Sequence, residues 1–153
     1  MKIRIEESCL KKIKGDLARP CEISYERVGF VFGNLLNGEI VLNEYMPISE
    51  QDYEHSNSFG AIFNKNAIKK ALGHILKTKK SCFQIHEHSK VFGSQFSQVD
   101  IETAIELCQS FHTFNTDMPH GSIVLCGKEM NVYFIDQLGN TDFILIGGND
   151  ERL

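Results

Sequence analysis

The chain has 153 residues, of which 42% are hydrophobic and 24% charged, and this length and composition are typical of one globular domain over residues 1–153. The formal net charge of −4 argues against nucleic-acid binding, and no apolar run approaches the ~18 residues of a transmembrane helix. The five cysteines are odd in number and include no C-x-x-C pair, which favours free thiols in a reducing, cytoplasmic setting.

The first part of the chain predicts a strand, a helix and a hairpin. Apolar and charged residues alternate near the N-terminus, as on a short strand, and apolar residues recur at helical spacing over 10–17. Two apolar runs, 28–32 and 40–46, flank the pair Asn37-Gly38. Asn-Gly between two such runs is a strong signal of a β-hairpin.

The middle of the chain predicts a loop, a helix and a strand. Residues 48–60 are polar and indicate a loop. An apolar stripe over 67–76 predicts a helix that begins after Asn64 or Asn66. Residues 82–88 follow with the pattern of a strand.

The last part of the chain predicts one further helix and three strands. Apolar residues recur at helical spacing over 101–111. Strands are expected at 123–126, 132–135 and 143–146. The mixture predicts an α/β fold with one main sheet.

His86 and His88 are candidate metal ligands. Alternate side chains of a strand share a face, so both imidazoles should point the same way, within about 7 Å along the chain. This spacing suits two ligands of one tetrahedral zinc ion. Asp100 can supply a third ligand if the preceding loop folds back, and the fourth position would then remain for water, as in catalytic zinc sites.

Each of these features also has a purely structural interpretation. An H-x-H sequence is common by chance and fits a partly buried structural pair. Ser97 and Asp100 fit a capping box, with serine as the N-cap and an acid at the third helical position. Glu26 alone is a carboxylate at the edge of a strand. The capping box and a metal ligand are compatible, because a helix start can hold a ligand in a defined position.

Three pieces follow one another in a specific order along the chain. They are Glu26 ahead of Gly29-Phe30-Val31-Phe32-Gly33, then His86-Glu87-His88, and after eight further residues Ser97-Gln98-Val99-Asp100. This order resembles the JAMM motif of the JAB/MPN metalloprotease family. The hairpin, the polar stretch and the helices also follow the order of that family, and Pro119-His120-Gly121 ahead of a strand is similar to its prokaryotic branch.

The resemblance implies a fold and a set of site residues. The fold would be a single JAB/MPN domain, with a mixed, mostly antiparallel sheet flanked by helices, similar to cytidine deaminases. His86, His88 and Asp100 would bind one Zn²⁺, Glu26 would be the general base, and Ser97 would help to stabilise the oxyanion.

The resemblance also implies a substrate. The chain would be a deubiquitinase-like isopeptidase or peptidase that hydrolyses the amide bond after the C-terminal glycine tail of a ubiquitin-like (β-grasp) protein or its conjugate, with conjugation enzymes as further partners. The loops 48–60 and 89–96 are the expected clamps for the tail. Glu87 stands where the family often has serine, and Ser89 stands where it usually has proline. The loop 89–96 should therefore differ in detail from that of the family.

Other functions fit parts of the same pattern. A non-catalytic MPN scaffold would lack part of the motif, and a general small-peptide zinc hydrolase would share the metal centre without the glycine tail. A zinc deaminase would need a later P-C-x-x-C, which the chain lacks. His120 fits either a residue lining the site or a plain loop residue.

Overall fold

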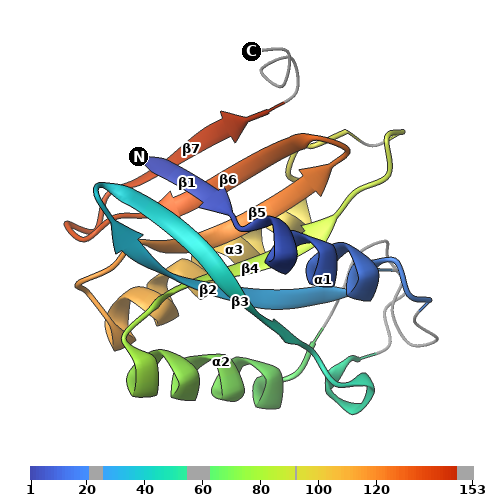
Figure 1. Cartoon of the computed structure of the whole chain (residues 1–153). Coiled ribbons are helices and arrows are strands. Elements are labelled where there is room, and N and C mark those ends of the chain that lie inside the picture. The colour runs from blue at the N-terminus through green and yellow to red at the C-terminus, as the bar shows by residue number, and fades with distance from the viewer. Residues whose placement is uncertain (21–25, 55–62, 92, 148–153) are drawn as a thin grey trace.

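The computed structural model describes residues 1–20, 26–54, 63–91 and 93–147, and its architecture is drawn in Figure 1. The elements follow in the order β1 (Lys2–Ile5), α1 (Glu7–Leu17), β2 (Val28–Leu36), β3 (Glu39–Pro47), a single 3-10 turn (Glu50–Asp52), α2 (Lys65–Thr78), β4 (Ser81–Glu87), α3 (Gln98–Phe114), β5 (His120–Cys126), β6 (Glu129–Ile135) and β7 (Thr141–Ile146).

The strands of the described residues form one seven-stranded sheet in the order β1-β3-β2-β4-β5-β6-β7. The pairs β1/β3 and β4/β5 are parallel, and the other neighbours are antiparallel. The expected α/β fold with a mixed, mostly antiparallel sheet flanked by helices is therefore confirmed. Residues 55–60 of the expected polar loop lie outside the described residues.

The β2/β3 hairpin turns at Asn37 and Gly38, as expected. Their φ angles are 53° and 78°, both in the left-handed region that a two-residue type I′ turn requires. Asparagine and glycine tolerate this region better than other residues do. The register then slips between Phe32 and Gly33, where the backbone of β3 comes very close.

Both helices that flank the candidate site begin at a capped residue. The side chain of Asn64 accepts hydrogen bonds from the first turn of α2, which decides between the two expected start points. Ser97 caps α3 in the expected capping box. None of the helices in the described ranges combines the length and the apolar character that a membrane span requires.

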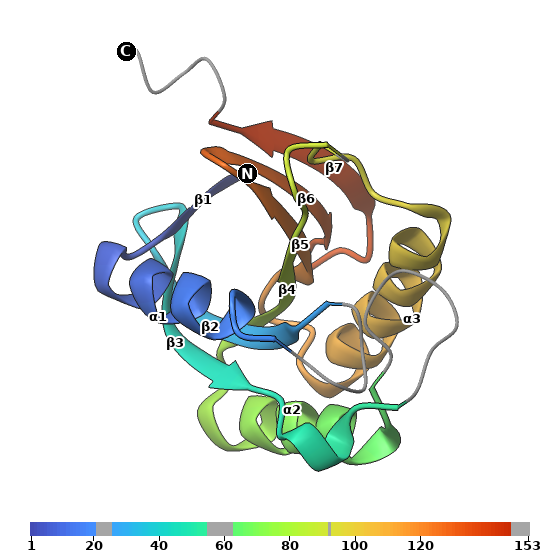
Figure 2. The same cartoon turned by 90° about the vertical axis from the view of Figure 1, so that its right-hand side faces the viewer.

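Two hydrophobic clusters lie on opposite faces of the sheet. On one face, Ile13 of α1 packs with Phe83 and Ile85 of β4. On the other face, α2 and α3 pack against Val28 and its neighbours in β2. Figure 2 shows α1 on one side of the curled sheet and α2 and α3 on the other. The side chains of β4 alternate between the two faces of the sheet. Because Phe83 and Ile85 face α1, Gln84 and His86 face the α2/α3 side, where the candidate site lies.

Candidate metal centre

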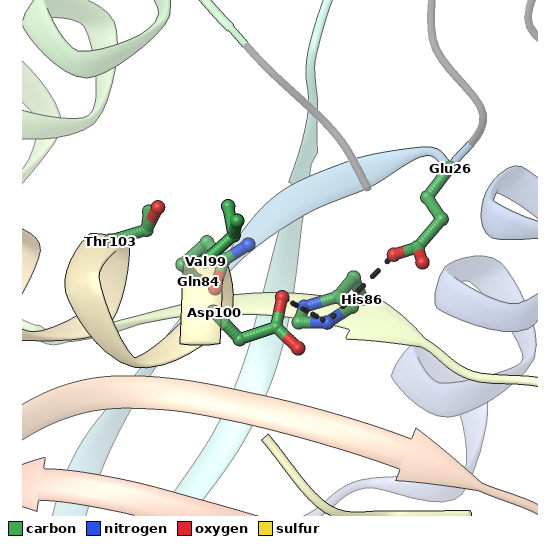
Figure 3. Close-up of a pocket in the computed structure, with 6 residues that line it drawn as sticks. All are labelled: Glu26, Gln84, His86, Val99, Asp100 and Thr103. Atoms are coloured by element: carbon green, nitrogen blue, oxygen red, sulfur yellow. Dashed lines mark ion pairs between the residues drawn. The ribbon is translucent and has the colours of Figure 1, made fainter. Parts of the chain in front are cut away.

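Three segments bring the four motif residues together. His86 pairs with Val28 across the antiparallel β2/β4 ladder. When this register is continued, Glu26 falls opposite His88, just beyond the ends of both strands. Asp100 lies in the first turn of α3, and Figure 3 shows its carboxylate and that of Glu26 on either side of the His86 ring.

The donor atoms of these residues are close enough to hold a metal ion. The Nε2 atoms of His86 and His88 lie 3.1 Å apart. One oxygen of Asp100 lies 3.2 Å from Nε2 of His86, and the other lies 3.2 Å from Nε2 of His88. Glu26 Oε2 is 3.9 Å from His86 Nε2, and Glu26 with the two histidines forms a group whose ligand atoms all lie within 4.8 Å of one another.

A comparison with metal geometry shows how well the donors fit. Zinc–nitrogen bonds of 2.0–2.1 Å place two ligands of a tetrahedral ion about 3.3 Å apart. The contacts among His86, His88 and Asp100 match this edge within about 0.2 Å. Glu26 lies farther out by about 0.6 Å. His86, His88 and Asp100 thus lie at distances that suit both hydrogen bonds and metal ligands, and Glu26 with the two histidines also forms a group that could hold a metal ion.

Hydrogen bonding orients one of the two imidazoles. Nδ1 of His88 lies 3.0 Å from the carbonyl oxygen of Gly93, and only the protonated nitrogen can donate there. Nε2 then faces the other donors, where it donates to Asp100 when the ring is protonated and offers its lone pair to a cation when the ring is neutral. His86 differs, because its buried Nδ1 has no hydrogen-bond partner among the described residues.

Asp100 and Ser97 form the capping box at the same time. Ser97 Oγ accepts a hydrogen bond from the Asp100 amide at 3.1 Å, and the Ser97 amide donates to Asp100 Oδ2 at 2.9 Å. That same oxygen faces His88. Within the described residues, the Ser97 hydroxyl makes no hydrogen bond to either histidine. Ser97 thus reaches the site through Asp100.

The charges of the site are strongly coupled. Burial alone would raise the pKa of Asp100, but hydrogen bonds with His86 and His88 outweigh it and hold that pKa far below its usual range. The hydrogen bond with Asp100 raises the pKa of His88, against the opposing effect of burial. An ionised carboxylate facing two imidazoles favours a cation between them, either a proton or a metal ion.

A small pocket lies among these residues. It has a volume of about 10 Å³, which is about the space that one water molecule needs. Its walls are Glu26, Gln84, His86, Val99, Asp100 and Thr103. A larger, mostly apolar pocket of about 200 Å³ adjoins it and shares Val99 and Thr103. Its other walls are Phe63, Ile68, Leu107, Glu106 and Ser110. Figure 3 shows Thr103 and Val99 on α3 beside the histidine.

Two residues of the site were not expected from the sequence. Gln84 lines the pocket, and its Oε1 accepts a hydrogen bond from the Ser122 hydroxyl. It could have been found from strand alternation, since it shares a face with His86 and His88. Gly93 contributes a backbone carbonyl, for which a sequence carries no signal.

His120 neither lines the candidate site nor lies in a loop. It is fully buried in β5, where Nδ1 accepts a hydrogen bond from the Cys82 amide and Nε2 donates to the carbonyl of Asn115. Burial lowers its pKa to about 4. His120 is therefore a structural residue of the core.

No family model and no curated protein matches this chain.

Proposed function

We propose that this chain is a zinc-dependent isopeptidase or peptidase of the JAB/MPN (JAMM) type. The observation that carries the proposal is the meeting of His86, His88 and Asp100 with edges of 3.1–3.2 Å beside the carboxylate of Glu26. These four residues come from three separate segments, and they are the residues that the motif names. A chance H-x-H pair would not gather two carboxylates.

The donor set supports zinc and the roles of the individual residues. Two imidazole nitrogens and one carboxylate are a common ligand set of catalytic zinc, and they leave a position open. Bound zinc would polarise a carbonyl group and lower the pKa of a water molecule toward ~7. The 3.9 Å separation of Glu26 from His86 favours a base over a fourth ligand.

Glu26 is suited to move a proton. Its side chain is 26% exposed, so its carboxylate faces both the small pocket and solvent. Oε2 accepts a proton from the attacking water and returns it to the nitrogen of the leaving amine. Such general acid–base help is typically worth ~10²–10⁴-fold in rate.

The role proposed for Ser97 is to donate a hydrogen bond toward the oxyanion. Its oxygen already accepts the Asp100 amide, so the hydroxyl proton is free for another acceptor. Donation to the developing negative charge of the carbonyl oxygen would stabilise the transition state. The Ser97 side chain is exposed at the helix start, where a substrate can reach it.

The two pockets support a glycine tail as the substrate. The small pocket has room for about one water molecule, so a side chain beside the scissile bond would clash. The adjoining apolar pocket over Val99 and Leu107 suits an apolar residue farther along the tail. Both features fit the flexible tail of a ubiquitin-like protein in a cytoplasmic setting, with its conjugation enzymes as partners. Residue 92 of the expected clamp 89–96 lies outside the described residues.

Cleavage of matched fusions tests the proposal. A prokaryotic β-grasp modifier is fused through a Gly-Gly tail to a reporter, and in a second fusion the last glycine is changed to phenylalanine. We expect zinc-dependent release of the reporter from the first fusion alone. Equal cleavage of both indicates a general peptide hydrolase, and one bound zinc without any cleavage of either indicates an inactive module. A chain that binds no zinc would overturn the proposal.

A further inference from the structure

A second, larger cavity lies on the opposite side of the sheet from the metal centre. Its volume is about 350 Å³. Its apolar wall consists of Ile3, Ile5, Leu10, Leu125, Met130 and Ile146. These residues come from β1, α1, β5, β6 and β7 and extend the hydrophobic cluster under α1. The proposed function makes no use of this cavity.

The cavity results from the curvature of the sheet. β1 and β7 are the two edge strands, and the curl brings β1 toward β6 and β7, as Figures 1 and 2 both show. Within the described residues, β1 pairs with β3 and β7 pairs with β6, so the two edges are not hydrogen-bonded to each other. Side chains of both edges line the space between them, which stays open to solvent.

Positive charge gathers around this apolar space. Lys14 crosses from α1 and donates from Nζ to the carbonyl oxygen of Gly127 at 3.2 Å, which leaves two of its three protons for another acceptor. Lys128 lies next to it and makes no ion pair within the described part of the chain. Arg4 also lines the cavity, although its guanidinium is paired with Glu39.

The one acidic residue of the lining is engaged elsewhere. Glu129, at the start of β6, accepts a hydrogen bond from the Ser94 hydroxyl at 2.9 Å. The cavity therefore combines an apolar interior with two lysine ammonium groups that outnumber the single carboxylate of Glu129, while Arg4 is paired with Glu39. Charge complementarity selects an anionic head group with an apolar body.

We propose that this cavity binds a single-chain anionic amphiphile, namely an alkyl carboxylate whose chain enters the space between β1 and β7. An apolar cavity of about 150 Å³ accepts benzene, so 350 Å³ has room for a chain of roughly ten carbons. The head group remains at the mouth beside Lys14 and Lys128. The site is independent of the metal centre.

Titration calorimetry with decanoate below its micelle concentration tests the proposal, with decyltrimethylammonium as the matched probe of opposite charge. We expect one decanoate per chain and at least tenfold weaker binding of the cation. Each buried methylene contributes about a fourfold change in affinity, so octanoate, which is two methylenes shorter, should bind about 15-fold more weakly than decanoate. No decanoate binding, or equal affinity for both head groups, would overturn the proposal.

Two pairs of variants locate the site. Ile146→Trp fills the cavity and should abolish decanoate binding, whereas Leu145→Trp on the other face of β7 should leave it unchanged. Lys14→Gln with Lys128→Gln should weaken it about tenfold. The charge-matched control is Lys11→Gln with Lys12→Gln, at exposed positions of α1. Wild-type affinity in both test variants would refute this site, and unchanged zinc content keeps the result separate from the metal centre.

Discussion

Nδ1 of His88 lies 3.0 Å from the carbonyl oxygen of Gly93, and this contact fixes which ring nitrogen faces the candidate metal centre. The loop that supplies the carbonyl is itself held by β6. Ser94 Oγ donates to Glu129 at 2.9 Å, and the Asn131 side chain donates to the Ser94 carbonyl at 3.1 Å. The orientation of one proposed ligand thus depends on β6, which lies two strands away from β4 in the sheet.

We expect Gly93→Ala to weaken zinc binding. Gly93 has a φ of 68°, which strains any residue with a Cβ atom, and relief of that strain would move its carbonyl away from His88. Loss of such an orienting contact typically costs 10–100-fold in metal affinity. Gly127→Ala is the matched control, because Gly127 has a φ of 60° in the β5/β6 turn. Competition with a chelator should separate the two variants, and equal zinc affinities would contradict the positioning role.

His88→Ala should remove the metal altogether. Wild-type protein purified without added metal should contain about one zinc per chain by elemental analysis, and the variant close to none, because two ligands do not retain the ion. His74→Ala is the control, since His74 of α2 contacts Glu44 of β3 and none of the four motif residues. Full zinc occupancy in His88→Ala would refute the ligand assignment.

Glu26→Gln should separate metal binding from catalysis. Glutamine keeps the shape and hydrogen bonding of the side chain but cannot accept the proton. We expect unchanged zinc content and a fall in kcat of ~10²–10⁴-fold on the Gly-Gly fusion. If the zinc is lost as well, Glu26 is a ligand; if activity survives, the base is another group.

Two glycines of the fold should respond oppositely to alanine. A Cβ atom at Gly33 would lie 2.0 Å from the carbonyl oxygen of Val41, so the β2/β3 backbone would have to shift. We expect Gly33→Ala to lower the free energy of unfolding by roughly 3 kcal/mol. In α2, a Cβ atom at Gly73 would meet nothing within 4 Å. Gly73→Ala should therefore raise the free energy of unfolding by about 0.5–1 kcal/mol. Urea unfolding measures both, and a neutral Gly33→Ala would contradict the close approach.

Acid should destabilise the fold partly through His120. Burial lowers its folded pKa to about 4, whereas the unfolded chain has a pKa of ~6.5. The unfolded state therefore takes up a proton first as the pH falls, so this contribution is complete above pH ~6.5 and is lost below it. Between pH 8 and 5 we expect a loss of about 2 kcal/mol. His120→Asn should show a correspondingly flatter dependence in urea unfolding, and an identical slope would rule out His120 as the cause.

Local spacing was sufficient to predict much of the fold. The Asn37-Gly38 turn and the Ser97 cap lie where the sequence indicates, because each depends on residues within a few positions of one another. The parallel pairing of β4 with β5 was not predictable in this way. It joins strands separated by a helix, and nothing in either segment specifies its partner.

In the candidate site, too, some features were predictable from the sequence and others were not. Its four charged or polar side chains are visible as a motif, and the structure brings Glu26, His86, His88 and Asp100 together. The Gly93 carbonyl could not be predicted, because every residue carries one. The role of His120 was hidden for a similar reason, since both of its ring nitrogens bond backbone atoms of the core.

The double use of Asp100 has a consequence for how the site is built. Its carboxylate is already held by the Ser97 amide, so an arriving ion finds it with little rotational freedom left to lose. The start of α3 is closed by the same bond. The helix cap and the candidate metal site therefore share one carboxylate, so any substitution at Asp100 alters the start of the helix and the candidate site together.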